Sequence, residues 1–566
     1  MATVISHNIV SPLGLTSEDN YAALKQGRSA LKRHDGRWEL KDPFCASLFA
    51  DGSFTSCFDT TRFELLVADS VKRALEQARI DIKSKRVAFI LSTTKGNVEL
   101  LADRNFPDET REYPAQAAEH VAALVGFAST PIVVCNACIS GLSAIILGQR
   151  LIESGDYDYA VVCGADSQSK FIVSGFQSLK ALSSESCRPF DKDRRGLNLG
   201  EAAATIVLGC DAAGDYMWHV VDGVVRNDSN HISGPSRTGE GSFRALRSVL
   251  KYCSADELAF VSVHGTATIY NDEMESIALE RAGLSSVPVN ALKGYYGHTM
   301  GAAGIMESII SMCAVDDRNI LPSRGFHEKG VSGNITVNAH NTVTDKTSFI
   351  KLMSGFGGCN AAVLFDKKPY RSALGTPPVK TVVTHRVTVT QEKAVVDGQA
   401  LPAEAVGKLF LTELYHSQVG DYAKFYKMDC LCKLGFIASE LLLKAEGGGR
   451  FIDREDRAVI LFNRSSSIVA DRKHQAAISD AGNFFPSPSV FVYTLPNIIT
   501  GEIAIRNKYY GETSLYILPE YSERTMSQVL SSAFLDGNMR SIISGWIDCP
   551  NEENFIATLF LMERVD

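Results

Sequence analysis

The chain has 566 residues, of which 45% are hydrophobic and 22% charged, and its net charge is −8. This length and composition predict two or more folded units and argue against a disordered chain. The acidic balance argues against a nucleic-acid partner, which would require a surplus of Lys and Arg.

The N-terminal residues lack the features of a secretory signal, and no apolar run reaches 18 residues. We therefore expect a cytoplasmic protein without a membrane span. The thirteen cysteines have no framework spacing, which is typical of reduced thiols.

Short runs of β-branched residues alternate with longer amphipathic segments along the first 366 residues, which predicts an α/β fold. The predicted strands lie at 87–94, 131–135, 159–165, 203–209 and 259–265, and two predicted helices lie at 63–78 and 141–154. The strands are apolar on both faces, as in a layered sandwich. Segment 367–381 combines basic residues, Ser, Gly and a Pro-Pro pair, which indicates a linker. A second α/β unit is expected beyond it.

Cys138 is the candidate nucleophile, because a predicted buried strand runs into it and then directly into a long helix. A thiol at a helix N-terminus lies near the positive end of the helix dipole, which should lower its pKa. Taken alone, Cys135 and Cys138 could also be ordinary core cysteines. A redox or metal pair is a further alternative, although no thioredoxin-like context or additional zinc ligands are visible nearby.

Two histidines complete the candidate site. His264 ends a β-branched strand, and His298 follows Lys293 and precedes a helix that opens with small residues. Singly, each histidine could be structural. Together with Cys138 they supply what acyl chemistry requires, a nucleophile and groups that stabilise or move charge.

Six segments resemble, in order, the motifs of a decarboxylating β-ketoacyl-(acyl-carrier-protein) synthase of the thiolase-fold superfamily, in its two-histidine elongating type. They lie at 11–14, 136–141, 188–204, 264–272, 293–304 and 354–362. The resemblance covers about residues 1–366. It implies a thiolase-like layered α/β/α/β/α sandwich of two duplicated halves, which we expect at 1–250 and 251–368.

The resemblance implies that Cys138 takes an acyl chain as a thioester from the phosphopantetheine of an acyl carrier protein. His264 and His298 are then implied to polarise the malonyl thioester carbonyl and to assist decarboxylation. Lys293 is implied to position His298. The substrates are malonyl and acyl thioesters, and no metal or further cofactor is expected.

Further roles follow from the same resemblance. Glu307 is implied to support the catalytic residues from behind, and Phe356 to act as a gate beside the thiol. Backbone N–H groups of Cys138 and Phe356 are expected to form an oxyanion hole, and Thr266 and Thr268 belong to the expected substrate-binding set.

Three positions depart from the family pattern. Asn136 stands where Thr is common, Ala267 where Gly or Ser is usual, and Cys359 where a hydroxyl residue is usual. These departures put the substrate's shape in doubt more than the reaction. Cys359 leaves thiolase-like chemistry as an alternative.

Segment 491–549 resembles the N-terminal half of the same fold, but Pro519, Glu520 and Tyr521 stand where a nucleophile would fall. We therefore expect a linker at 369–382 and a degenerate half-synthase at 383–566; an unrelated small α/β domain is the alternative. The resemblance implies that synthases of this family pair as homodimers through the strand and helices near the nucleophile. Such a copy could cover that surface, giving an intrachain pseudo-dimer in place of a homodimer. Two other functions remain open, a non-catalytic partner resembling chain-length factors and a redox protein.

Overall fold

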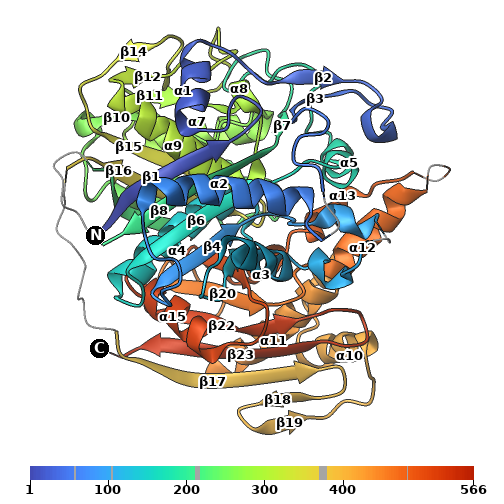
Figure 1. The fold of residues 1–566 in the computed structure, drawn as a ribbon. Helices are drawn as coiled ribbons and strands as arrows, with labels where there is room; N and C mark the ends of the chain where they lie inside the picture. Colours follow the sequence, from blue (N-terminus) through green and yellow to red (C-terminus); the bar gives the residue numbers. More distant parts are fainter. Residues whose placement is uncertain are drawn as a thin grey trace.

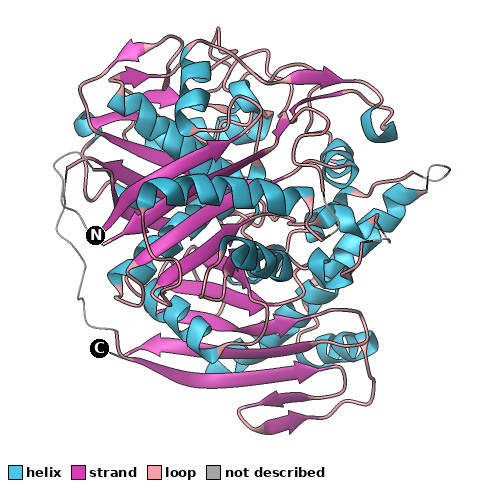
Figure 2. Ribbon diagram, in the orientation of Figure 1, coloured by secondary structure: helices cyan, strands magenta, loops and turns pink. Residues whose placement is uncertain are grey.

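The computed structural model describes residues 1–56, 59–103, 106–210, 217–368, 379–480, 482 and 484–565. Helices cover a long series of paired strands, as Figures 1 and 2 show. Most of the expected linker, residues 369–378, lies outside the described residues. No helix in the described ranges has both the length and the apolar character needed to cross a bilayer.

The first half of the fold is a five-stranded sheet with helices on both faces. Its strand order is β1 (Ala2–Val10), β8 (Ala202–Gly209), β6 (Tyr159–Asp166), β4 (Val87–Ser92) and β5 (Ile132–Val134). Strands β1 and β6 lie antiparallel to β8, whereas β6, β4 and β5 are parallel. One face packs against α2 (Arg62–Ala78) and α3 (Pro114–Val125), and the other against α4 (Ser140–Glu153).

The second half repeats this strand order and these directions. Its strands are β9 (His219–Asn227), β16 (Cys359–Asp366), β15 (Ser348–Gly355), β10 (Leu258–Ser262) and β11 (Pro288–Asn290). By strand order this half begins at His219, so the boundary expected at residue 250 falls inside it. Helix α9 (Ala303–Asp316) packs against α4 between the two sheets, which gives the layered arrangement expected from the sequence.

The C-terminal unit, described for residues 379–480, 482 and 484–565, repeats the same order a third time. Its strands are β17 (Thr381–Thr390), β23 (Ile556–Arg564), β22 (Ser541–Asp548), β20 (Arg457–Asn463) and β21 (Thr513–Ile517). Pro519, Glu520 and Tyr521 lie between β21 and α15 (Glu523–Ala533), the place that Cys138 occupies between β5 and α4.

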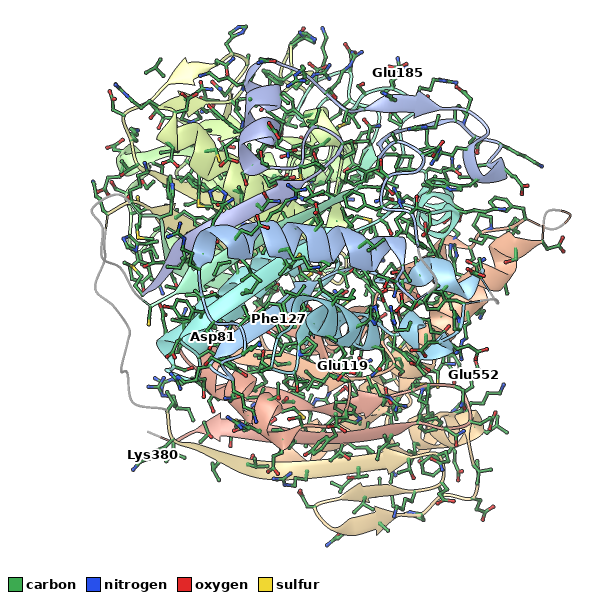
Figure 3. The ribbon with its side chains drawn as sticks, in the orientation of Figure 1. Asp81, Glu119, Phe127, Glu185, Lys380 and Glu552 are labelled. Carbon is green, nitrogen blue, oxygen red and sulfur yellow. The ribbon has the colours of Figure 1, made fainter. Side chains whose placement is uncertain are left out.

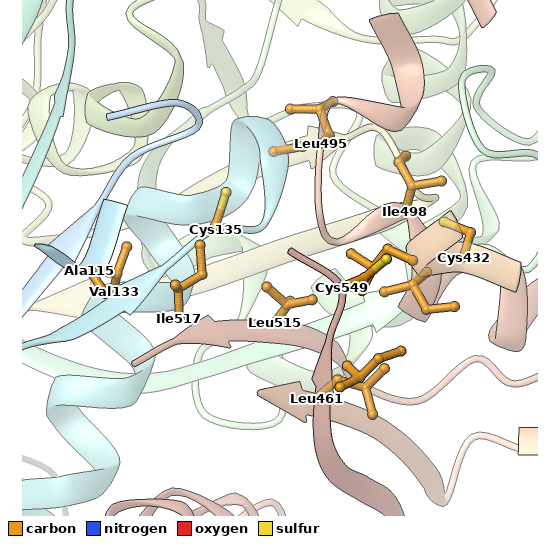
Figure 4. Close-up of a cluster of buried hydrophobic side chains, with 14 of the residues drawn as sticks. Ala115, Val133, Cys135, Cys432, Leu461, Leu495, Ile498, Leu515, Ile517 and Cys549 are labelled. Atoms are coloured by element: carbon orange, nitrogen blue, oxygen red, sulfur yellow. The ribbon is translucent and has the colours of Figure 1, made fainter. Parts of the chain in front are cut away.

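The C-terminal unit joins the first half through equivalent elements. Strand β21 pairs antiparallel with β5, with Tyr516 opposite Val134, and α15 packs against α4. Figure 4 shows side chains of both units meeting there, Val133 and Cys135 beside Leu515 and Ile517. A buried ion pair between Arg150 and Glu512 (2.7 Å) adds to the contact. The edge of β5 is therefore covered within one chain.

The remaining helices connect and flank these sheets. They are α1 (Ser17–Lys25), α5 (Lys170–Ser178), α6 (Glu240–Val249), α7 (Ile269–Arg281), α8 (Lys293–Tyr296), α10 (Lys408–Gln418), α11 (Cys430–Glu446), α12 (Ile468–Ser479), α13 (Pro488–Tyr493) and α14 (Ile498–Asn507). Short strands complete the fold, namely β2 (Lys32–His34), β3 (Phe44–Ser47), β7 (Leu199–Gly200), β12 (Asn319–Ile320), β13 (Thr336–Val337), β14 (Thr342–Val343), β18 (Ala394–Val396) and β19 (Gln399–Leu401).

Candidate active site

Cys138, His264 and His298 meet in one cavity of about 450 Å³. The Cys138 sulfur and one ring nitrogen of each histidine all lie within 4.8 Å of one another. The two rings stand edge to face, with their centroids 5.0 Å apart. Residues separated by up to 160 positions in sequence are thus brought to one point, because the turns after β5 and β10 and the turn before α9 open onto the same space.

Each of these residues lies close to one held in the left-handed backbone region. Ala137 (φ +47°) precedes Cys138, Ala267 (φ +63°) follows His264 by three positions, and Met300 (φ +53°) follows His298 by two. Such conformations cost about 1–3 kcal/mol each in non-glycine residues and persist only where the surroundings hold them. The departure at Ala267 therefore falls where glycine would be free of strain.

Cys138 lies in a short 3-10 turn (Ala137–Ile139) between β5 and α4 and is partly exposed to the cavity. Burial raises the pKa of the Cys138 thiol to about 12, and the nearby charge of Lys293 only partly opposes this. The expectation of an unusually acidic thiol is wrong, because loss of water around the sulfur outweighs the favourable helix N-terminus. The resting side chain is a neutral thiol.

His298 presents a hydrogen-bond donor to the cavity. Its Nδ1 accepts a hydrogen bond from the backbone N–H of Met300 (3.2 Å), so the ring hydrogen belongs on Nε2. That Nε2 is buried and has no hydrogen-bond partner among the described residues. Burial, with the charges of Lys293 and Lys351, holds the pKa of His298 well below its usual range, so the ring is neutral.

His264 lies two residues beyond β10 and is fixed through its backbone. The N–H groups of His264 and Gly265 each donate to the carboxylate of Glu275 on α7, both at 2.7 Å. Burial lowers the pKa of His264 far below its usual range, and the charges of Lys293, His298 and Lys351 add to this effect. Its Nδ1 is also without a partner in the described structure.

A buried Lys-Glu-Lys cluster lies behind the histidines. Glu307 accepts from Lys293 (2.8 Å) and from Lys351 (2.5 Å), and all three side chains are at most 1% exposed. Lys293 also donates to the backbone carbonyl of His264 (2.5 Å), so its side-chain hydrogen bonds go to that carbonyl and to Glu307. Two lysines against one carboxylate leave positive charge beside the cavity, which stabilises negative charge on a bound substrate.

Lys351 is absent from the residues predicted from the sequence. The signal for it is a single charged residue inside the buried strand SFIKLMSG. Burial lowers its pKa to about 8. A lone lysine in an apolar strand requires a buried partner, which Glu307 supplies.

Phe356, Thr266 and Thr268 line the same cavity. The two threonine hydroxyls are hydrogen-bonded at 2.8 Å. Phe356 follows β15, its ring stacks on Phe176 with centroids 6.4 Å apart, and its carbonyl accepts from Asn497 of the C-terminal unit (2.9 Å). The C-terminal unit therefore holds the loop that carries Phe356.

Comparison with known proteins places this site in a family. The model of the beta-ketoacyl synthase N-terminal domain matches residues 3–212, and that of the C-terminal domain matches residues 219–327. Together the matches span more than half of the chain. The chain belongs to the β-ketoacyl synthase family.

Its relatives include a 3-oxoacyl-[acyl-carrier-protein] synthase 2 of Vibrio cholerae, 26% identical over 64% of this chain and 98% of that protein. The ketoacyl synthase alpha subunit of the tetracenomycin polyketide synthase of Streptomyces glaucescens is 30% identical, over 46% of this chain and 65% of its own length. These relatives match only part of the chain.

Two solved structures share the fold, one over about two thirds of the chain and one over all of it. A β-ketoacyl synthase from Burkholderia phymatum aligns with 65% of this chain and 99% of its own (TM-score 0.59, 22% identity). A structure titled PfaC keto synthase-chain length factor aligns with 100% of this chain and 78% of its own (TM-score 0.78, 12% identity). The fold of the C-terminal unit of this chain thus has a structural counterpart.

The other two cysteines considered from sequence do not line the main cavity. Cys135 is buried and its thiol donates to the carbonyl of Thr94 (3.5 Å), while the buried Cys359 donates to the carbonyl of Phe356 (3.3 Å). Both are free thiols, as is every other described cysteine. The redox and thiolase-like alternatives therefore lack a second thiol at the cavity.

Cys138 and the two histidines form a donor set of a kind that binds zinc. Ligand atoms around tetrahedral zinc lie only about 3.3–3.8 Å from one another, given metal–ligand bonds of about 2.0–2.3 Å. The three atoms here spread to 4.8 Å, and the buried lysines add positive charge close by. The arrangement fits an anionic substrate better than a cation.

A second, smaller space of about 10 Å³ adjoins Cys138 and Phe356. Its exposed wall is apolar and includes Phe491 and Leu495 of the C-terminal unit. Phe491 is almost completely buried and packs edge to face on Phe176 (5.4 Å). The C-terminal unit thus forms part of the surroundings of the nucleophile.

Proposed function

We propose that the chain is an active 3-oxoacyl-[acyl-carrier-protein] synthase, which joins an acyl group held on Cys138 to a malonyl group delivered by an acyl carrier protein. The observation that supports this most is the meeting of Cys138 with two neutral histidines in one cavity. A non-catalytic partner subunit would have no need to retain that trio.

In the first step the Cys138 sulfur attacks the carbonyl of an acyl thioester. The carbon–sulfur bond to the carrier breaks, the carrier thiol leaves with the thiol proton, and an acyl-enzyme forms. Backbone N–H groups of Cys138 and Phe356 would stabilise the oxyanion, and Thr266 and Thr268 would contact the pantetheine arm along the cavity.

In the second step the malonyl thioester loses carbon dioxide. The electron pair of the broken carbon–carbon bond passes into an enolate, whose oxygen accepts hydrogen bonds from His298 Nε2 and from His264. The charge of the Lys293–Glu307–Lys351 cluster adds to this stabilisation. The enolate carbon then attacks the acyl carbonyl, the bond to Cys138 breaks, and the released thiolate takes up one proton.

We further propose that the C-terminal unit is a degenerate half-synthase that acts as a built-in partner. The threefold repetition of one strand order, the pairing of equivalent strands β5 and β21, and the likeness to a keto synthase-chain length factor structure support this. In this proposal the unit, and not the whole chain, takes the part that a chain-length factor plays for a synthase.

The test is to incubate the protein with a panel of acyl-carrier thioesters and to map the acyl group by peptide mass spectrometry. We expect one acyl group on Cys138, its loss in Cys138→Ala and its retention in Cys135→Ala. Addition of malonyl-carrier should then discharge it. Absence of acylation with every member of the panel would contradict the proposal.

A further inference from the structure

The C-terminal unit carries a groove of about 360 Å³ between α10, the start of α11, α12 and α13. We call it the lysine groove, because its wall includes Lys408, Lys427, Lys433 and Lys473, together with Leu409 and Tyr426. The proposed reaction at Cys138 does not use this groove.

Charge in the lysine groove runs against that of the whole chain, whose net charge is −8. Lys408 forms an exposed ion pair with Glu552 (3.1 Å), a residue labelled in Figure 3. Lys427, Lys433 and Lys473 form no ion pair with a described carboxylate. The groove therefore offers at least three cationic groups to a ligand from outside.

Apolar side chains stand exposed beside these charges. Leu409 is 65% exposed and Tyr426 is 55% exposed, and Val406, just ahead of α10, is 66% exposed. Exposed apolar side chains gathered at a groove and rimmed by charge are typical of a protein-binding surface. The partner that fits is an acidic helix that carries an apolar side chain among its carboxylates.

The lysine groove also lies next to the reaction site. Ser489, Val490 and Tyr493 of α13 line the groove, whereas Phe491 of the same short helix lines the space beside Cys138. Tyr426 and Lys427 belong to a short 3-10 helix (Ala423–Lys427).

The charge of Lys424, in that helix, acts on His231 of the cavity wall. Ile232, which lines the main cavity, packs against the large apolar core that the first half shares with the C-terminal unit. Burial, followed by the charge of Lys424, lowers the pKa of His231, another residue of the cavity wall. The groove is therefore linked to the surroundings of Cys138 through α13, and to the cavity wall through Lys424 and His231.

From this geometry we propose that the lysine groove is the docking surface for the acidic carrier protein that delivers the malonyl and acyl thioesters. The inference rests on the proposed synthase function. It assigns to the C-terminal unit the recognition of the carrier, in addition to its contacts behind Cys138. Attraction between exposed charges is screened by salt over about 8–10 Å, so the KM for carrier-bound substrate should rise with ionic strength.

The test compares carrier-bound and carrier-free substrates in the full-length protein. The triple variant Lys427→Glu, Lys433→Glu and Lys473→Glu should raise the KM for malonyl-carrier at least tenfold. Its turnover of malonyl and acyl groups on N-acetylcysteamine should stay within twofold of the unchanged protein. A carrier with lysines in place of its helix carboxylates should restore a low KM to the variant.

Two further variants keep the test decisive. Lys444→Glu alters an exposed lysine on the same helix as Lys433 and should leave the carrier KM unchanged. Leu409→Glu alters an exposed side chain of the groove and should also raise the KM for malonyl-carrier. It serves as the test if the triple variant is unstable.

The inference is overturned if a folded triple variant keeps the KM of the unchanged protein for malonyl-carrier. It is equally overturned if carrier-bound and carrier-free substrates lose activity together. Failure of the synthase function looks different, since the unchanged protein would then condense neither kind of substrate.

Discussion

Asn136 and Leu515 are joined by a hydrogen bond in which the side-chain oxygen of Asn136 accepts from the backbone N–H of Leu515 (2.7 Å). The N–H of Cys135 donates in turn to the carbonyl of Leu515 (3.2 Å). The turn that presents Cys138 is therefore held from the C-terminal unit. This contact gives a physical reason for Asn at a position where Thr is common in the family.

Replacing Asn136 should accordingly affect both stability and chemistry. Asn136→Ala leaves a buried N–H without its acceptor, which should lower the free energy of unfolding by about 1–3 kcal/mol. Acylation of Cys138 should also slow, because the turn loses its anchor. Denaturant unfolding and single-turnover acylation measure the two effects.

Ser129→Ala is a suitable control, since its hydroxyl donates to the carbonyl of Val87 (2.7 Å) in the first half. It should reduce stability while acylation stays at the rate of the unchanged protein. If Asn136→Ala acylates equally fast, the anchoring role of this hydrogen bond is wrong.

His298 should matter for decarboxylation far more than for acyl transfer. His298→Ala removes the Nε2–H donor, and the loss of one such donor typically costs about 10²–10³ in rate. Carbon dioxide release from malonyl-carrier should fall by that factor, whereas a burst of acylation at Cys138 persists. If decarboxylation and acylation of Cys138 slow by the same factor in His298→Ala, the role of His298 as a donor to the enolate is wrong.

The raised pKa of Cys138 predicts how the rate of its alkylation depends on pH. Because the pKa of Cys138 is about 12, the thiolate fraction rises about tenfold for each pH unit below that value. Alkylation by iodoacetamide should therefore accelerate steadily between pH 7 and pH 9, without a plateau. In Lys293→Met a nearby positive charge is lost, so the pKa should rise further and alkylation should slow at each pH. A plateau below pH 8 would contradict the neutral resting state.

Phe491 should limit the length of the acyl chain. Phe491→Ala enlarges the small space beside Cys138, so longer acyl-carrier substrates should gain in kcat/KM relative to short ones. Intact-mass analysis of carrier products over a panel of chain lengths measures this. Val490 lies next to Phe491 but lines the lysine groove, so Val490→Ala should keep the original chain-length preference. If both variants shift this preference equally, Phe491 does not limit chain length by filling the space beside Cys138.

The chain should behave as a monomer of 61.5 kDa in light scattering. The edge of β5 is already paired with β21, so the strand through which two copies would pair is occupied. A stable homodimer in which β5 pairs with a second copy would contradict the built-in partner.

Local sequence patterns predict much of the fold. The buried runs at 87–94 and 203–209 are strands because β-branched residues suit a sheet covered on both faces, and the motif segments place Cys138, His264 and His298 at the ends of elements. By contrast, segment 489–495 is rich in β-branched and aromatic residues yet begins as helix α13, with Pro488 in its first turn. Tertiary packing decides such short segments.

Contacts between distant residues could not be predicted in this way. Asn136 and Leu515 are 379 positions apart, and no periodicity reports their contact. The pKa of Cys138 depends on the walls that several elements build around the sulfur, whereas the helix that follows it is visible in the sequence. Lys351 was not predicted, although it is a single charge in an apolar strand, and its pairing with Glu307 became evident from the fold.

Decarboxylative condensation on Cys138 can be followed by supplying malonyl-carrier with all three malonyl carbons labelled with ¹³C, together with an unlabelled acyl-carrier. We expect labelled carbon dioxide and a 3-oxoacyl-carrier that has gained two labelled carbons, and no labelled 3-oxoacyl-carrier from Cys138→Ala. An unchanged acyl chain in the presence of the folded, Cys138-acylated protein and malonyl-carrier would contradict it.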